Sequence, residues 1–135
     1  MTGAIRTNYA TGTPWEPVVG YSRAVRVGPM VFVSGTTATG PDGRLVGSDD
    51  AGAQTRQVIA NIKAALERAG ARLEDVVRTR IYVRDIAQWE AIGRAHGDVF
   101  GAIRPASAMV EVSGLVDPAM LVEIEADAYV TSADA

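Results

Sequence analysis

Acidic side chains recur at every second position near the end of the chain. Glu123, Glu125 and Asp127 alternate with small apolar residues, and Glu111 lies in an earlier run of the same kind. Such alternation is typical of a strand with one buried face and one polar face. A carboxylate that is partly buried on such a face can have a shifted pKa and can move protons during a reaction. The candidates for this chemistry therefore lie in the last strands.

Basic side chains offer a simpler explanation of the same carboxylates. Arg78, Arg80 and Arg84 alternate with apolar residues over 76–84, which predicts a strand that carries the arginines on its polar face. If this strand lies beside the acidic one, cross-strand pairs follow, each worth about 0.2–1 kcal/mol. From the residues alone, ion pairing of this kind is the simpler interpretation of Glu123.

His96 is the only histidine, and it falls in the apolar sector of a helix expected over 86–102. Packing is the default interpretation, but an ordinary pKa near neutrality also makes His96 a candidate acid, base or ligand contact. The chain has no cysteine, so it offers no thiolate nucleophile and no usual zinc site. Phosphate-binding loops, dinucleotide fingerprints and nucleophile elbows are also missing. We therefore expect no metal and no cofactor.

Length and composition predict one globular domain over residues 1–135, because 47% of the residues are hydrophobic and 21% are charged. The net charge of −3 argues against a general nucleic-acid binder, since phosphate binding needs clustered cations. The start of the chain lacks a signal-like apolar core, and no run of about 18 apolar residues exists. We expect a soluble cytoplasmic protein without a membrane partner.

Periodicity and turn residues predict an α+β fold of order β-β-α-β-α-β-β, with two helices on one face of a mostly antiparallel sheet. The other face must then be hydrated or meet another subunit. The expected elements are an extended arm over 1–17, strands over 18–27 and 30–34, a helix capped by Asp49 or Asp50, the strand 76–84, a helix capped by Asp85, and a final hairpin with its turn at 114–118.

The last of these segments resembles the C-terminal signature of the Rid (YjgF-like) family. The matching residues are Pro105-Ala106, the strand end Val110-Glu111-Val112 and the run 122–126. Earlier, Ser34-Gly35 and a tyrosine thirteen residues before the serine, Tyr21, also match. The well-studied members hydrolyse reactive enamines and imines. The resemblance implies a chorismate-mutase-like fold, a homotrimer, and small-molecule pockets in the clefts between subunits.

The resemblance also implies roles for single residues. Glu123 matches the glutamate that positions or activates the attacking water, and Tyr21, Ser34 and Gly35 match positions that line the pocket. Met109 stands where enamine-hydrolysing members often have a cysteine, which contributes mainly backbone contacts. The segment from His96 to Pro105 resembles a subset of the family and keeps His96 as a second catalytic candidate.

Ser107 departs from the family pattern, because the well-studied members have an arginine there. That arginine grips a substrate carboxylate with its planar fork, whereas serine offers one hydroxyl. A charged hydrogen bond contributes roughly 1.5–3 kcal/mol, so its loss could weaken acid binding about ten- to a hundredfold. Arg104, Arg23 and Arg80 are candidate replacements for the missing cation.

Three functions follow from this departure. The first is an enamine or imine deaminase with an atypical substrate. The residues that would bind this substrate are Tyr21, Ser34, Gly35, Arg104, Ser107 and Met109. The second is a non-catalytic trimer that binds a small metabolite. The third is a cofactor-free enzyme that acts on a neutral ligand in the same pocket. Fold alone does not decide between them.

Overall fold

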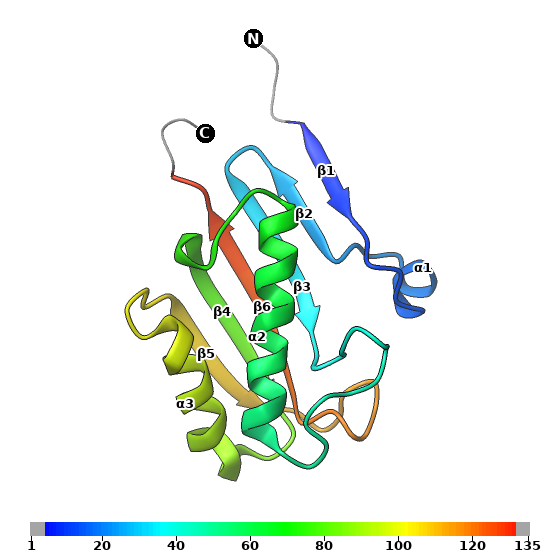
Figure 1. Cartoon of the computed structure of the whole chain (residues 1–135), viewed down its shortest axis with the longest axis vertical. Helices are drawn as coiled ribbons and strands as arrows, with labels where there is room; N and C mark the ends of the chain where they lie inside the picture. Colours follow the sequence, from blue (N-terminus) through cyan, green and yellow to red (C-terminus); the bar gives the residue numbers. More distant parts are fainter. Residues whose placement is uncertain (1–4, 132–135) are drawn as a thin grey trace.

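The computed structural model describes residues 5–131, which form a six-stranded sheet with two long helices on one face (Figure 1). The strand order is β1-β2-β3-β6-β4-β5; only β4 and β5 pair in parallel. The α+β fold with helices on one face is confirmed. The elements are β1 Arg6–Tyr9, α1 Trp15–Val19, β2 Ala24–Val27, β3 Met30–Thr36, α2 Ala51–Arg68, η1 Leu73–Asp75, β4 Val76–Val83, η2 Ile86–Gln88, α3 Trp89–Phe100, β5 Ala106–Glu111 and β6 Val122–Tyr129.

The last two strands do not form the predicted hairpin. β4 lies between them and pairs antiparallel with β6 and parallel with β5. Glu111 lies opposite the buried Val83, whereas Glu123 lies opposite Tyr82, so Glu111 does not share a face with the acids of β6. Its Oε1 atom instead accepts a hydrogen bond from the Ile86 N–H at 2.9 Å, beside the start of α3. Periodicity identified both runs as strands but carried no information about their neighbours.

The N-terminal region is more ordered than the predicted arm over 1–17, of which residues 1–4 lie outside the described part. Residues 6–9 are extended but pair with β2 as an edge strand. A short helix, α1, replaces the start of the strand predicted over 18–27, so that β2 begins only at Ala24. The buried Glu16 carboxylate anchors this region, because it accepts hydrogen bonds from the backbone and hydroxyl groups of Thr11 and Thr13.

The predicted N-cap is found for helix α2 but not for helix α3. Of the two predicted N-cap candidates, Asp50 caps α2 by accepting a hydrogen bond from the Ala53 N–H at 3.0 Å. Gly70 follows the end of α2 with a φ of 81°, which suits a glycine. Asp85 accepts from the Ala87 N–H, but it caps the short 3-10 helix η2, and α3 begins only afterwards. Helical periodicity does not separate these two kinds of turn.

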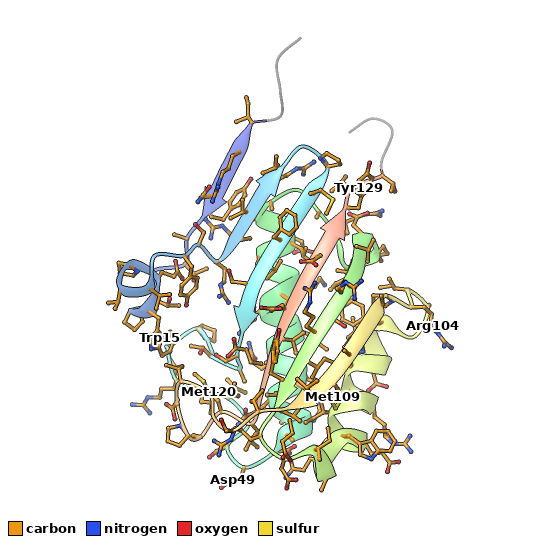
Figure 2. The ribbon with its side chains drawn as sticks, turned by 180° about the vertical axis from the view of Figure 1, so that it is seen from behind. Trp15, Asp49, Arg104, Met109, Met120 and Tyr129 are labelled. Atoms are coloured by element: carbon orange, nitrogen blue, oxygen red, sulfur yellow. The ribbon has the colours of Figure 1, made fainter. Side chains whose placement is uncertain are left out.

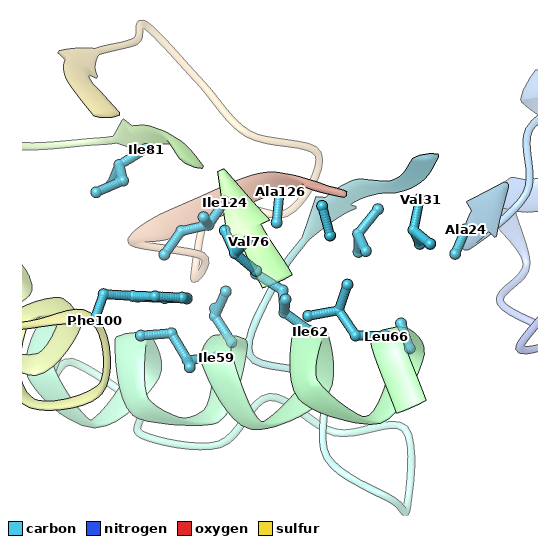
Figure 3. Packing of buried hydrophobic residues seen from close by; sticks show 14 of the residues in the cluster. Ala24, Val31, Ile59, Ile62, Leu66, Val76, Ile81, Phe100, Ile124 and Ala126 are labelled. Atoms are coloured by element: carbon cyan, nitrogen blue, oxygen red, sulfur yellow. The ribbon is translucent and has the colours of Figure 1, made fainter. Parts of the chain in front are cut away.

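The core lies between α2 and the sheet, as Figure 3 shows for the apolar side chains that α2 and the strands direct toward each other. Ile62, Leu66, Val31 and Ile124 are fully buried in this layer. Trp89, a large apolar residue of α3, is 59% exposed. It lies at the first turn of the helix.

Strand β4 positions one polar residue on its buried face. A register shift between Val76 and Arg78 turns Val76 inward and leaves Val77 48% exposed. After the shift the expected alternation returns, and Thr79 is completely buried with Ile81 and Val83. Thr79 therefore points toward the helices.

The opposite face of the sheet carries the charged side chains, seen in Figure 2. Arg80 Nη1 lies 3.1 Å from Asp127 Oδ2 and 3.7 Å from Glu125 Oε1, and the Tyr82 hydroxyl donates to Glu125 Oε1 at 2.9 Å. The predicted cross-strand pairing is thus confirmed for Arg80. Within residues 5–131, no helix has the length and apolar character needed to cross a membrane.

Candidate functional site

A cleft of about 1030 Å³ opens where β3 ends and β6 begins. Its walls come from the N-terminal segment, the loop after β3, helix α2 and the loop before β6. Four of the predicted site residues line it together: Tyr21, Ser34, Gly35 and Glu123. The structure therefore brings these four into one place, although they come from three separate segments of the chain.

A β-bulge exposes the Ser34-Gly35 backbone to this cleft. The β3–β6 register runs from Val33 opposite Ala126 to Thr36 opposite Ile124, so one extra residue is inserted in β3. The observed position of the Glu123 carboxylate depends on glycine here, because a Cβ at position 35 would overlap that carboxylate. The Ser34 hydroxyl donates to the Ser22 carbonyl at 2.6 Å, so its hydrogen is used and its oxygen can act toward a ligand only as an acceptor.

Glu123 is partly buried beside this bulge. Burial raises the pKa of the Glu123 carboxyl above the 4.5 of an unperturbed glutamate; the Arg23 guanidinium counteracts the rise, and Glu125 adds to it. The ion pairs within residues 5–131 do not include Glu123, whereas Glu125 and Asp127 on the same strand are paired with Arg80. Glu123 is thus the carboxylate of β6 that remains available to a ligand.

Arg23 supplies positive charge to the same cleft. Its Nη2 atom donates to the Gly35 carbonyl at 2.8 Å and its Nη1 atom to the Thr36 hydroxyl at 3.0 Å. The guanidinium also lies 5.9 Å from the centre of the Tyr21 ring, within reach of a cation–π contact. Of the three candidate replacements for the family arginine, Arg23 is the one that lines the cleft with Glu123.

The other predicted site residues lie elsewhere. His96 and Arg104 line a smaller pocket of about 310 Å³ at the end of α3. Ser107 and Met109 lie on β5, opposite Thr79 and Ile81 of β4, and therefore face the helix side of the sheet. Arg80 lies on the charged face, paired with Asp127.

One chain thus holds two separate groups of candidate residues. In Figure 2, Trp15 and Met120, which line the large cleft, lie toward one side of the sheet, whereas Met109 and Arg104 mark the β5 edge on the other. Strand β4 separates β5 from β6, and the side chains of Glu123 and Ser107 belong to opposite faces of the sheet. A site that uses both groups needs more than one chain.

Sequence reasoning missed Thr79. The Thr79 hydroxyl donates to Ser107 Oγ at 2.8 Å and lies 3.0 Å from His96 Nε2, so it connects two of the predicted site residues. A signal was present, because a threonine within a buried apolar alternation must find hydrogen-bond partners. Among residues 5–131, no group of three His, Cys, Asp or Glu side chains is arranged to hold a metal ion.

Comparison with known proteins places this geometry in a family. The family model described as Endoribonuclease L-PSP matches residues 11–130. The chain is 40% identical over 119 residues to the 3-aminoacrylate deaminase RutC of Acinetobacter baylyi, with 88% of this chain and 93% of that protein covered.

Solved structures agree. A member of the YjgF/YER057c/UK114 family from Mycobacterium tuberculosis has 54% identity and a TM-score of 0.85, with 93% of this chain and all of that chain covered. The Rid family protein YyfA from Yersinia pestis has 34% identity and a TM-score of 0.81 at the same coverage. The chain therefore belongs to the Endoribonuclease L-PSP family, the group that also bears the names YjgF and Rid.

Proposed function

We propose that the protein is an enamine or imine deaminase, which releases a carbonyl compound and ammonia. The observation that carries this proposal is the Glu123 carboxylate, which is partly buried, forms no ion pair within residues 5–131, and lies beside the Ser34-Gly35 bulge in a large cleft. The similarity to a 3-aminoacrylate deaminase supports the same reaction class.

The chemistry follows from the position of this carboxylate. An enamine tautomerises to an imine, whose carbon accepts the oxygen of water. Glu123 takes a proton from that water and returns it to the nitrogen of the tetrahedral intermediate, after which the C–N bond breaks and ammonia leaves. A carboxyl pKa raised by burial suits this task, because it brings the base closer to the pKa of the groups with which it exchanges protons.

The pocket of this enzyme would form between the subunits of a homotrimer. The two groups of site residues are separated within one chain, and no helix in the described residues 5–131 covers the charged face of the sheet. Cyclic association would place the β5 edge of one chain, with Ser107, against the Glu123 cleft of the next. Several features stay predictions: the small-molecule partner, the trimer, the lack of nucleic-acid, membrane and cofactor partners, and the cytoplasmic location.

The substrate would differ from that of members with the arginine. Arg23 places a cation in the Glu123 cleft, but two of its nitrogens are already used by Gly35 and Thr36. It can therefore attract a carboxylate without offering a free planar fork. We expect weak binding of acidic substrates, or preference for substrates without a carboxylate.

The test is a coupled assay with the purified protein. A dehydratase generates 2-aminoacrylate or its homologue, a second assay supplies 3-aminoacrylate, and a neutral imine is tested in parallel. Acceleration of carbonyl release that Glu123→Gln abolishes supports the proposal; Glu67→Gln, an exposed change on α2, is the matched control. A folded protein that accelerates none of these reactions would instead fit the binding-only interpretation.

A second variant tests the substrate preference. Ser107→Arg restores the side chain of the well-studied members, so we expect the KM for 2-aminoacrylate to fall about ten- to a hundredfold. Ser107→Gln adds length without charge and should not lower this KM. Equal effects of the two variants would contradict the assigned role of position 107 in carboxylate binding.

A further inference from the structure

A continuous hydrogen-bond chain joins the only imidazole of the protein to the exposed strand β5. His96 Nε2 lies 3.0 Å from Thr79 Oγ1, and Thr79 Oγ1 donates to Ser107 Oγ at 2.8 Å. Thr79 is completely buried, His96 is half-buried against Phe100, and Ser107 is exposed. The hydrogen-bond chain therefore leads from the half-buried imidazole through the protein interior to an exposed hydroxyl on β5.

The donors and acceptors in this chain have one consistent order. A threonine hydroxyl has a single hydrogen, and that of Thr79 is directed to Ser107. The oxygen of Thr79 must then accept a hydrogen bond from the Nε2–H group of His96. Ser107 uses a lone pair to accept from Thr79, so its own hydroxyl hydrogen is free to donate outward.

We propose that His96, Thr79 and Ser107 form a proton relay that delivers a proton from the half-buried imidazole to the nitrogen of a ligand at Ser107. This inference rests on the proposed function and deepens it, because it assigns the source of the proton that the imine nitrogen takes up as water attacks, before Glu123 returns its own proton to the leaving amine. Glu123 would then act on the water, and Ser107 of a neighbouring subunit on the nitrogen.

The transfer balances without any further reagent. The ligand nitrogen takes the Ser107 hydroxyl hydrogen, Ser107 takes the hydrogen of Thr79, and Thr79 takes the Nε2 hydrogen of the imidazolium. The imidazole ends neutral with its hydrogen on Nδ1, and both hydroxyls now point the other way, from Ser107 to Thr79 and from Thr79 to Nε2. Return of a proton from water to the imidazole restores the starting order.

The surroundings of His96 favour a readily released proton. Burial lowers the pKa of His96, so the imidazolium gives up its proton more easily than an exposed one. Arg104 is the charged side chain that lines the same pocket, and its Nε atom donates to the Gly101 carbonyl at 2.7 Å. On α3, Glu90 and Arg94 pair with each other, and Arg78 and Arg80, beside Thr79 on β4, project to the opposite face.

Nuclear magnetic resonance tests the relay without any substrate, because a chain with one histidine gives one set of imidazole signals. In the wild type the Nε2 signal should be that of a hydrogen-bonded N–H. Thr79→Val should move this signal and lower the pKa of His96 further, whereas Thr79→Ser should preserve both. If Thr79→Val changes neither the Nε2 signal nor the pKa of His96, the relay is overturned.

The kinetic test uses the amine-releasing reaction of the preceding subsection. We expect His96→Gln, Thr79→Val and Ser107→Ala each to lower kcat about 100-fold, with little change in KM, and Thr79→Ser to restore it. Ser48→Ala, an exposed serine before α2, is the control. In the wild type, kcat/KM should decrease at high pH, with an apparent pKa equal to the His96 pKa measured by nuclear magnetic resonance. This decrease should be absent in His96→Gln.

The outcomes separate the two proposals. If Glu123→Gln loses turnover while His96→Gln keeps wild-type kinetics, the deaminase proposal is supported and the relay is rejected. A wild-type protein that turns over no substrate would reject the deaminase, and the imidazole spectra of Thr79→Val and Thr79→Ser would then decide the relay alone. If Thr79→Val does not fold, Ser107→Ala and His96→Gln carry the kinetic test.

Discussion

At the scale of single residues, Gly35 connects the backbone to the proposed chemistry. A methyl group there would overlap the Glu123 carboxylate, which is the far end of a flexible side chain and can move away. We therefore predict that Gly35→Ala lowers kcat about 100-fold while changing the free energy of unfolding by less than about 1 kcal/mol. Turnover and urea unfolding measure the two effects.

Gly114→Ala is the matched control, because a Cβ at that position meets no atom within 4 Å. It should leave both quantities unchanged. Wild-type turnover in Gly35→Ala would show that the observed position of Glu123 is not the one used in the reaction.

Glu123 also gives stability a definite dependence on pH. Because burial raises its pKa above 4.5, the folded chain binds more protons than the unfolded chain just above that pH. The contribution of Glu123 to stability therefore falls as the pH rises from the unfolded pKa through the folded one. Glu123→Gln removes this penalty, so its Tm should exceed that of the wild type at about pH 7 and approach it near about pH 4. An equal offset at both pH values would contradict the burial argument.

The site residues differ in how far the sequence could predict them. Tyr21, Ser34, Gly35 and Glu123 were found through their resemblance to a family motif, and they meet in one cleft. Thr79 belongs to no motif, and its importance depends on two partners that are 17 and 28 residues away. Such a connection exists only once β4, β5 and α3 are packed together.

At the scale of elements, the N-terminus of α2 offers a paired test. Asp50 has an extended backbone and accepts a hydrogen bond from the third helical N–H, whereas Asp49 has a φ of 60°. Asp50→Ala should lower the free energy of unfolding by about 1 kcal/mol. Asp49→Asn should have little effect, because asparagine tolerates the left-handed region. Thermal unfolding of both variants checks the assignment, and equal losses would contradict it.

The elements themselves were largely predictable, but their arrangement was not. Caps and periodicity located α2 and β4 closely, because both signals are local. The separation of β5 from β6 by β4 depends on pairing between distant segments, which alternation does not encode. Residues 6–9 fall in the predicted arm, because an edge strand of four residues is too short for its alternation to be recognised.

At the scale of the whole molecule, the proposed site requires more than one chain, because its two groups of residues are separated within each chain. Glu123 belongs to the cleft between β3 and β6, and Ser107 to the outer strand β5. A trimer with cyclic symmetry would bring one residue of each kind together at each of its interfaces. Activity should therefore be lost when the trimer dissociates, even where the single chain stays folded.

Mixing two inactive proteins tests this directly. Glu123→Gln lacks the base, and Ser107→Tyr obstructs the β5 half of the pocket; each should sediment as a trimer and be inactive. After the two are unfolded and refolded together in equal amounts, a mixed trimer would contain one interface with an intact Glu123 facing an intact Ser107. About a quarter of the wild-type rate should return, from random assembly of cyclic trimers. Mixed trimers without recovered activity would show that Glu123 and Ser107 do not meet across an interface, and each chain would then have to carry any chemistry within its own cleft.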